Sequence, residues 1–335
     1  MSNYNVAIIG TAGHGGYVKS VSADNAFRIN ITAVSGNANE LTVLTASYPG
    51  AVPYASLVEL VAKERIHIAV VNPEFSLLAE TASLFIRNRI PVFMDKPFAL
   101  SYETLAELAA LAKQYRTPVY PMFDMRYRDA FYTARALVRS GAIGETVLIS
   151  AQKSYKLGER APFFRSRKTY GGTIPWIAIH AVDFIRYVTD VRYTSVSARH
   201  TVLGNAGHGE LESAAVMNFT TAGGALVSVT ADYLRPGAAP SHGDDRLRVA
   251  GTKGVIEIRG GKLFIIDAKG ERDAALDHPP RQIFDDVIAC VEGNTDTLTD
   301  ASDGFYATAV SLAARDSADR GETVSLDAAA QYLVS

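Results

Sequence analysis

Short apolar runs alternate with helical patterns through the first third of the chain. The strand-like runs cover residues 5–10, 29–34, 67–71, 90–94 and 118–122. Between them apolar positions recur at helical spacing, as over residues 77–88. Runs that are continuously apolar, rather than alternating, are typical of strands covered on both faces. The alternation therefore predicts βαβ units and an α/β domain with a doubly wound parallel sheet.

The pattern changes in the second half of the chain. After a helix predicted over residues 127–140 and a strand over 146–150, strands follow one another without intervening helices, at 191–203, 211–219, 225–233, 247–250 and 255–258. This succession predicts a largely antiparallel open sheet in an α+β domain. We expect two domains, residues 1–124 and 125–335, with late helices over 282–292 and 303–319 packing on the first domain or on the sheet.

Composition narrows the class of protein. A chain of 335 residues exceeds what one hydrophobic core usually serves, which supports two domains. The net charge of −2 argues against a general nucleic-acid binder. The single cysteine, Cys290, excludes an intrachain disulfide and a cysteine-based metal cluster, and we predict no metal site. With no secretory pattern and no membrane-length apolar run, we expect a cytoplasmic protein that does not enter a membrane.

A glycine-rich loop follows the first predicted strand. The stretch Gly10-Thr11-Ala12-Gly13-His14-Gly15-Gly16 predicts a tight turn entering a helix, whose N–H groups can hold a pyrophosphate. The dinucleotide fingerprint falls on Gly10, Ala12 and Gly15, and alanine at the second position crowds the closest approach to phosphate. The neighbouring Gly13 relieves that crowding. Alone the motif also fits a plain strand–turn–helix; its place after an N-terminal strand favours NAD or NADP binding.

The ends of the next strands do not decide which dinucleotide binds. An acid for the ribose hydroxyls is expected after the second strand, where the chain has Ser35-Gly36-Asn37 and no arginine for a 2′-phosphate. Ser35 and Asn37 either bond a ribose or form a turn. Asn72 and Pro73 close the strand at 67–71, and we place both at the cofactor.

The strongest candidate for chemistry is Lys96. It follows an apolar strand in Asp95-Lys96-Pro97, and ligands of open α/β sheets bind outside such strand ends. Its ammonium could stabilise an oxygen on which charge develops. The alternative is a surface lysine paired with Asp95.

A predicted helix over residues 171–187 carries a polar stripe. At about 100° per residue Trp176, His180, Asp183 and Tyr187 share one face. His180 could accept a hydroxyl proton and Asp183 could orient it; the alternative is a structural His–Asp contact. The segment from Lys153 through Tyr155 to Lys168 is locally basic, so it either attracts a carboxylate or phosphate or forms a solvated loop.

Together these features resemble the family of glucose–fructose oxidoreductase and inositol dehydrogenase-like enzymes. The resemblance spans nearly the whole chain, and its motifs stand in the family's order: the glycine loop, Asp95-Lys96-Pro97 in place of Glu-Lys-Pro, Arg126-Tyr127, Gly141-Ala142-Ile143-Gly144, Gly171-Gly172 with His180 and Asp183, and residues 313–326. It implies a Rossmann domain followed by a sheet domain that forms homodimers or homotetramers, with the substrate between the domains.

The resemblance also implies roles for individual residues. Lys96 would contact both nicotinamide and the substrate oxygen, and His180 would be the proton acceptor. Asp95 would join the cofactor site, and Arg126, Tyr155, Trp176 and Asp183 would contact the substrate. The expected activity is NAD(P)-dependent hydride transfer between nicotinamide and a secondary alcohol or ketone of a sugar, cyclitol or related polyhydroxy compound.

Three departures from the family's pattern keep alternatives open. Trp176 stands where many relatives have an aspartate, no histidine lies near Leu77, and Ala12 replaces a glycine. These changes suggest either an unusual substrate or a loss of catalytic activity. The second hypothesis is therefore a catalytically silent dinucleotide-binding sensor or regulatory protein of the same fold. A third is NAD-assisted glycoside cleavage.

Overall fold

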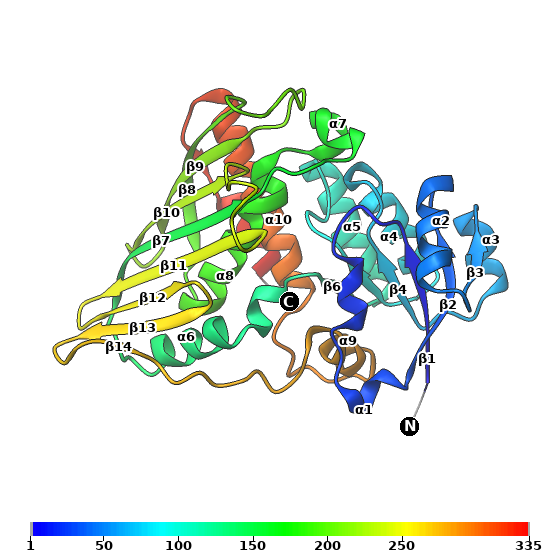
Figure 1. Ribbon diagram of the computed structural model, residues 1–335, viewed down its shortest axis with the longest axis horizontal. Coiled ribbons are helices and arrows are strands. Elements are labelled where there is room, and N and C mark those ends of the chain that lie inside the picture. Colours follow the sequence, from blue (N-terminus) through cyan, green and yellow to red (C-terminus); the bar gives the residue numbers. More distant parts are fainter. Residues whose placement is uncertain (1–2, 334–335) are drawn as a thin grey trace. The chain divides into compact units, whose positions relative to one another are not determined.

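A computed structural model describes residues 3–333 of the chain, which divides into two compact units. Unit 1 is formed by residues 1–122 and 281–305, and unit 2 by residues 123–280 and 306–335. The first change of unit lies beside the division expected between residues 124 and 125. Residues 281–305, however, return to unit 1, so this unit is discontinuous in sequence (Figure 1).

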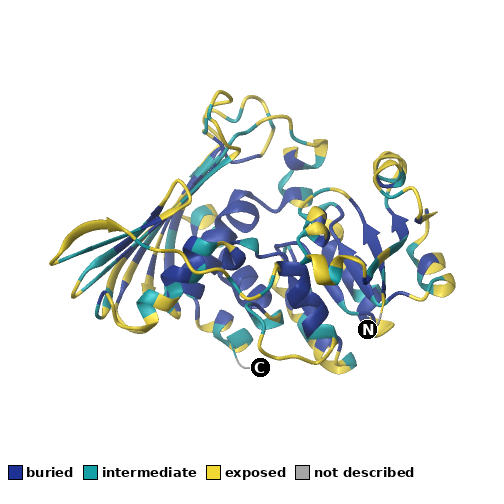
Figure 2. Ribbon diagram, turned by 60° about the horizontal axis from the view of Figure 1, so that its bottom comes forward, coloured by how far each residue is buried: buried dark blue, intermediate teal, exposed yellow. Residues whose placement is uncertain are grey.

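Unit 1 contains a six-stranded parallel sheet in the order β3-β2-β1-β4-β5-β6. Its strands are β1 (Tyr4–Ile9), β2 (Ile29–Ser35), β3 (Val52–Tyr54), β4 (Ile68–Val71), β5 (Val92–Met94) and β6 (Val119–Pro121). Every residue of β4, β5 and β6 is buried, in agreement with their continuous apolar runs, and buried strands of this unit are dark blue in Figure 2. The strand order reverses between β1 and β4, where doubly wound sheets bind ligands at the carboxyl ends of their strands. The predicted doubly wound sheet is confirmed.

The helices of unit 1 are mostly those predicted. They are η1 (Gly15–Lys19), α1 (Ala23–Ala26), α2 (Ala38–Ser47), α3 (Leu57–Lys63), η2 (Phe75–Leu77), α4 (Leu78–Arg87), α5 (Tyr102–Tyr115) and α9 (Ile283–Val291). The glycine loop leads into only a short 3₁₀ helix, η1, because two glycines begin it and Ser20, Ser22 and Asn25 follow, all poor helix formers.

Helix α9 supports this short segment from far along the chain. The Phe284 amide donates to the Ser20 carbonyl at 3.0 Å. The Asp285 carboxylate accepts hydrogen bonds from the Ser22 amide and hydroxyl and from the Asn25 side chain. The segment after the glycine loop is therefore held by residues more than 250 positions away.

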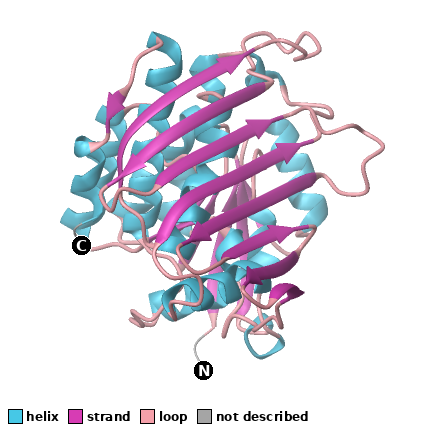
Figure 3. Cartoon of the chain, turned by 90° about the vertical axis from the view of Figure 1, so that its left-hand side faces the viewer, coloured by secondary structure: helices cyan, strands magenta, loops and turns pink. Residues whose placement is uncertain are grey.

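Unit 2 contains a nine-stranded sheet in the order β14-β13-β12-β11-β7-β10-β9-β8-β15. Its strands are β7 (Thr146–Tyr155), β8 (Tyr193–Thr201), β9 (Ala214–Thr221), β10 (Leu226–Asp232), β11 (Gly243–Gly251), β12 (Val255–Arg259), β13 (Lys262–Asp267), β14 (Gly270–Asp273) and β15 (Val324–Ser325). Only β7 and β10 pair in parallel, which confirms the predicted largely antiparallel sheet. Along β9 buried and exposed residues alternate, so one face packs on helices, and Figure 3 looks onto the other face.

The helices of unit 2 include one that is almost wholly buried. They are η3 (Asp124–Tyr127), α6 (Asp129–Arg139), η4 (Pro162–Arg165), α7 (Arg167–Tyr170), the π-helix η5 (Ile174–Ala178), α8 (Ile179–Thr189), α10 (Ala301–Arg320), which begins in unit 1, and η6 (Asp327–Leu333). Helix α8 packs against β7, and nine of its residues are buried. Within residues 3–333, no helix combines the length and apolar character needed to cross a membrane.

Candidate active site

Two glycines of the predicted cofactor loop have no room for a side chain. Gly10 has φ +75°, and a Cβ there would lie 2.4 Å from the Pro73 Cα. A Cβ on Gly15 would lie 2.5 Å from the Asn72 side chain. The loop after β1 therefore passes tightly against the end of β4, which requires glycine at both positions.

Asn72 positions the glycine loop through three hydrogen bonds. Its side-chain nitrogen donates to the Ile9 carbonyl at 2.9 Å, and its side-chain oxygen accepts from the Gly15 amide at 3.3 Å. Its backbone carbonyl accepts from the Ala12 amide at 2.9 Å. Asn72 was predicted to contact the cofactor, and in the structure it shapes the loop on which a cofactor would rest.

A carboxylate that the sequence did not point to lies between the loop and β2. Glu40, in the first turn of α2, accepts hydrogen bonds from the Thr11 amide at 3.0 Å and from the Asn37 amide at 2.9 Å. Gly36 leaves space for it, since a Cβ there would lie 2.7 Å from the Glu40 Cβ. The sequence signal was the spacing Asn37-x-x-Glu40, a capping box that brings the side chain of its third residue back to the helix start.

The residues first proposed at this place have other partners. The Ser35 hydroxyl is buried and donates to the Tyr54 carbonyl at 2.8 Å. The Asn37 side chain caps α2 by accepting from the Asn39 and Glu40 amides. Glu40, from the first turn of α2, therefore supplies the carboxylate that the strand end itself lacks, and Ser35 is used within the sheet.

Asp95 joins the glycine loop to the lysine. Asp95 and Lys96 follow β5, and both are fully buried. The Asp95 carboxylate accepts hydrogen bonds from the Lys96 amide at 2.9 Å and the His14 amide at 2.5 Å, and its oxygens lie 2.9 and 3.1 Å from His14 Nδ1. Burial alone would raise the pKa of Asp95, but the positive charge and hydrogen bonds of His14, with the charge of Lys96, lower it. Lys96 is thus fixed beside the predicted cofactor loop.

The loop fits a dinucleotide by the chemistry of its donors. The Thr11 amide already binds an anionic oxygen, that of Glu40. Gly13 and Gly16 are exposed, and a Cβ on Gly16 would meet nothing within 4 Å. Backbone amides in such a glycine-rich turn form a concavity suited to phosphate.

In unit 2, the predicted proton acceptor lies at the start of α8. His180 is 1% exposed, and its ring faces that of Phe123 at 6.2 Å between centroids. Trp176 belongs to the π-helix before α8, is 5% exposed and meets Phe164 edge to face at 6.2 Å. Both residues are in the buried part of the unit.

Arg126 and Asp183 form a buried ion pair. The Arg126 Nε lies 3.1 and 3.2 Å from the two Asp183 oxygens, and its terminal nitrogen adds a third contact at 2.5 Å. The guanidinium also lies over the Tyr187 ring, 5.1 Å from its centroid, and burial raises the pKa of Tyr187 to about 12. The pair joins η3 to α8, so these two residues hold the His180 helix in place.

Tyr155 ends β7 beside a buried lysine. The Lys153 ammonium lies 5.0 Å from the Tyr155 ring centroid and 2.7 Å from the Asp245 carboxylate. The ring of His242 packs on Tyr155 at 4.9 Å. Burial raises the pKa of Tyr155, and Lys153 opposes that rise. Lys153 is therefore part of the sheet and not of a solvated loop.

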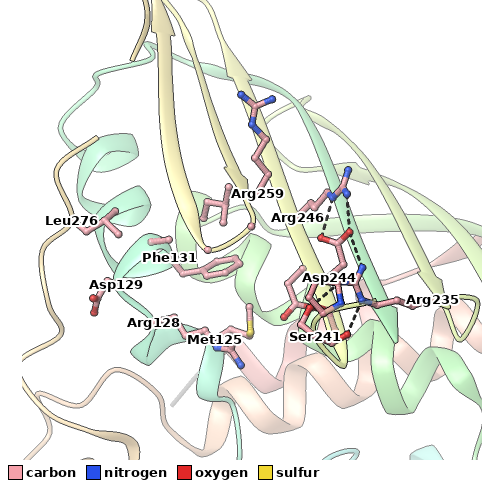
Figure 4. Close-up of a pocket in the computed structure, with 17 residues that line it drawn as sticks. Met125, Arg128, Asp129, Phe131, Arg235, Ser241, Asp244, Arg246, Arg259 and Leu276 are labelled. Carbon is pink, nitrogen blue, oxygen red and sulfur yellow. Dashed lines mark hydrogen bonds and ion pairs between the residues drawn. The ribbon is translucent and has the colours of Figure 1, made fainter. Parts of the chain in front are cut away.

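A cavity of about 910 Å³ opens nearby in unit 2, between the start of α6 and strands β11 and β12. In Figure 4 Arg235, Ser241, Asp244 and Arg246 form one side as a hydrogen-bonded group, with Phe131 facing them across the space. Among the described residues, no group of three or more histidine, cysteine, aspartate or glutamate side chains could hold a metal ion.

A glycine loop tied to a buried lysine at the end of a parallel strand defines a dinucleotide-binding oxidoreductase domain. The comparison with known families agrees. Residues 4–123 match the model described as oxidoreductase family, NAD-binding Rossmann fold, and residues 131–257 match the GFO/IDH/MocA C-terminal domain. The chain belongs to the Gfo/Idh/MocA oxidoreductase family, and unit 1 carries its NAD-binding Rossmann domain.

Solved and curated relatives extend the comparison. A Thermotoga maritima structure described as that of a candidate oxidoreductase is 36% identical, with a TM-score of 0.89 over 96% of this chain and 99% of the other. Levoglucosan dehydrogenase, solved with NADH and L-sorbose, has a TM-score of 0.82 at 18% identity over 97% and 99% of the two chains, a likeness of fold. Inositol 2-dehydrogenase of Klebsiella pneumoniae is 26% identical over 42% of this chain and 40% of its own length. For two curated relatives, one of Synechocystis and one of Schizosaccharomyces pombe, both described as oxidoreductases, the match spans about two fifths of their length.

Proposed function

We propose that the protein catalyses hydride transfer between a nicotinamide dinucleotide and a secondary alcohol or ketone of a polyhydroxy compound such as a sugar or cyclitol. The observation that carries the proposal is the Asp95 carboxylate, which bonds both the His14 amide in the glycine loop and the Lys96 amide. A buried cation held beside a cofactor loop suits a reaction in which negative charge develops on an oxygen. The names of levoglucosan dehydrogenase and inositol 2-dehydrogenase support the substrate class.

The mechanism assigns one task to each polar group. The dinucleotide, when bound, supplies the hydride acceptor or donor. Gly10, Ala12, Gly13 and Gly15 form the loop that holds its phosphates, with Asn72 and Pro73 behind it. The Lys96 ammonium stabilises the substrate oxygen. The His180 imidazole accepts the hydroxyl proton during oxidation and returns it during reduction.

Arg126 and Asp183 have a positioning role in this proposal, because their ion pair fixes the helix that bears His180. Trp176 and Tyr155 line the substrate side. The large, nearly buried Trp176 ring favours a substrate with an apolar sugar face over one that needs a carboxylate at that place.

We also propose NAD in preference to NADP. Glu40 lies at the carboxyl end of β2 and reaches the Thr11 amide of the glycine loop. An acid at this point of a Rossmann sheet accepts hydrogen bonds from ribose hydroxyls and repels a 2′-phosphate.

The test is calorimetric titration of the full chain with NADH and NADPH, followed by turnover with a panel of polyols and sugars. Saturable NADH binding with turnover is the expected result. Lys96→Met should keep NADH affinity within a few fold and reduce kcat by about 10²-fold or more, the usual effect of removing one group that stabilises an oxyanion. Lys113→Met, at an exposed site late in α5, is the matched control.

The outcomes separate the candidate functions. Absence of binding by both dinucleotides refutes the oxidoreductase. NADH binding without turnover of any compound in the panel supports the catalytically silent binding protein instead. Product formed from a glycoside with no net NADH supports NAD-assisted cleavage.

A further inference from the structure

Two cations in unit 2 have no acidic partner among the residues that the structure describes. Lys156 and Arg160 follow β7 and are both half-buried. The Lys156 ammonium donates to the Ala239 carbonyl at 2.5 Å, and an Arg160 terminal nitrogen donates to the Lys156 carbonyl at 2.8 Å. Among residues 3–333, no carboxylate lies within ion-pair distance of either one, whereas neighbouring Lys153 is neutralised by Asp245.

The Arg160 guanidinium is held in place by aromatic rings. It lies 4.7 Å from the Tyr233 ring centroid and 5.4 Å from that of Phe164. Its Nε is buried and has no hydrogen-bond partner in the described part of the chain. Burying a guanidinium N–H without a partner is costly, and an anionic oxygen would remove that cost.

The pKa of His242 reflects the charges that surround the cluster. Its ring packs on Tyr155, and its backbone carbonyl accepts from the Lys156 amide at 3.0 Å. Desolvation first, and then the charges of Arg160, Lys156 and Lys153, lower the pKa of His242. Asp245 only partly opposes them, so positive charge predominates around this exposed ring.

Ring contacts connect this cluster to the residues assigned to the substrate. Phe164, which faces Arg160, meets Trp176 edge to face at 6.2 Å. On the other side Lys153 contacts the Met125 sulfur at 3.9 Å, and Met125 directly precedes Arg126 of the buried ion pair. Arg160 is thus linked through Phe164 and Trp176 to η5, which directly precedes the helix of His180, and all these residues belong to unit 2.

Residues next to the cluster line the cavity in Figure 4. Ser241 and Gly243, which flank His242 in sequence, both line it, and the Arg235 amide bonds the Tyr155 carbonyl at 3.1 Å. The arginines that line the cavity itself already have acidic partners. Arg235 and Arg246 share Asp244, Arg128 pairs with Asp124, and Arg259 pairs with Glu271.

We propose that Lys156 and Arg160 form an anion-binding subsite, so that the substrate of the proposed oxidoreductase is an acidic polyhydroxy compound whose carboxylate or phosphate they hold. That the bound anion is part of the substrate rests on the proposed function. The subsite itself does not depend on it, because it stands on the two cations without acidic partners. Carboxylate and phosphate share the planar or forked oxygen geometry that a guanidinium binds.

The experiment measures simple anions, so no knowledge of the sugar is needed. The full chain with saturating NAD is titrated at constant ionic strength with inorganic phosphate and, separately, with acetate. Binding is followed by thermal stabilisation and by the fluorescence of Trp176, the single tryptophan. Arg160→Gln and Lys156→Gln remove one cation each. Lys168→Gln removes an exposed positive charge from α7 as the matched control.

Saturable stabilisation is expected in the wild type and in Lys168→Gln, weakened about tenfold or more in Arg160→Gln and Lys156→Gln. The anion that binds identifies the acidic group. No saturable response to either anion, or an equal response in Arg160→Gln, overturns the subsite. If NADH binds but Arg160→Gln does not change the stabilisation by either anion, the subsite is refuted and the oxidoreductase is not. If the anion response depends on Arg160 while NADH does not bind, the subsite stands and the oxidoreductase fails.

Discussion

Replacing Glu40 with glutamine tests the assignment of NAD with little change in structure. Glutamine can also complete a capping box, so Glu40→Gln keeps the start of α2, removes the charge and leaves one acceptor oxygen where the carboxylate has two. A hydrogen bond to a charged group is worth about 1.5–3 kcal/mol, so NAD affinity should fall by about 10- to 150-fold. The repulsion of a 2′-phosphate should disappear with the carboxylate.

The energy of repulsion between the Glu40 carboxylate and a 2′-phosphate can be estimated from their charges and their separation. A carboxylate about 5 Å from a doubly charged phosphate costs about 1.7 kcal/mol even with the dielectric constant of water, and more where Glu40 is half-buried. The ratio of NADP to NAD affinity should therefore rise by about two to three orders of magnitude, since the losses for NAD and the gains for NADP combine.

The assay is calorimetric titration of wild type and variant with NADH and NADPH at low and moderate salt. Glu103→Gln, at an exposed site in the first turn of α5, controls for the loss of a helix-terminal charge. A ratio of affinities unchanged by Glu40→Gln, or changed equally by Glu103→Gln, would refute the assignment of Glu40 to the ribose.

Two further predictions concern buried charges. Asp95→Asn should lower the free energy of unfolding at pH 7 by about 3 kcal/mol, since it removes a buried carboxylate bonded to His14. Because the folded pKa of Asp95 is depressed, its contribution is fully present above the unfolded pKa of about 3.9 and is lost as the pH falls through the folded pKa. Urea unfolding should show a smaller difference in the free energy of unfolding between wild type and Asp95→Asn at pH 3.5 than at pH 7. An equal difference at both pH values contradicts this prediction. Arg126→Met and Asp183→Asn should each cost about 3–5 kcal/mol, and the double variant less than their sum; strict additivity in the same unfolding assay would argue against the pair.

The sequence was enough to predict the features that depend on local pattern. The parallel strands, the glycine loop and the place of Lys96 at a strand end follow from apolar runs and their breaks. The bonds from Asp95 to His14 and from Arg126 to Asp183 join positions 81 and 57 residues apart, which no periodicity encodes.

The helix of His180 shows where periodicity fails. The predicted stripe assumed 100° per residue from Trp176 onward. The structure has a π-helix over Ile174–Ala178, whose wider turns change that angle. The segment after η1 could not be predicted for another reason, because the residues of α9 that hold Ser20, Ser22 and Asn25 lie far along the chain.

Unit 1 is completed by residues 281–305, and this has a consequence for synthesis on the ribosome. At about 5–20 residues per second, the 158 residues between positions 122 and 281 take about 8–32 s to appear. During that interval the carboxylate of Asp285 that holds Ser22 does not yet exist. The nascent Rossmann unit must wait with the segment after its glycine loop unsupported, and residues 123–280 of unit 2 are made before helix α9 closes the unit that began first.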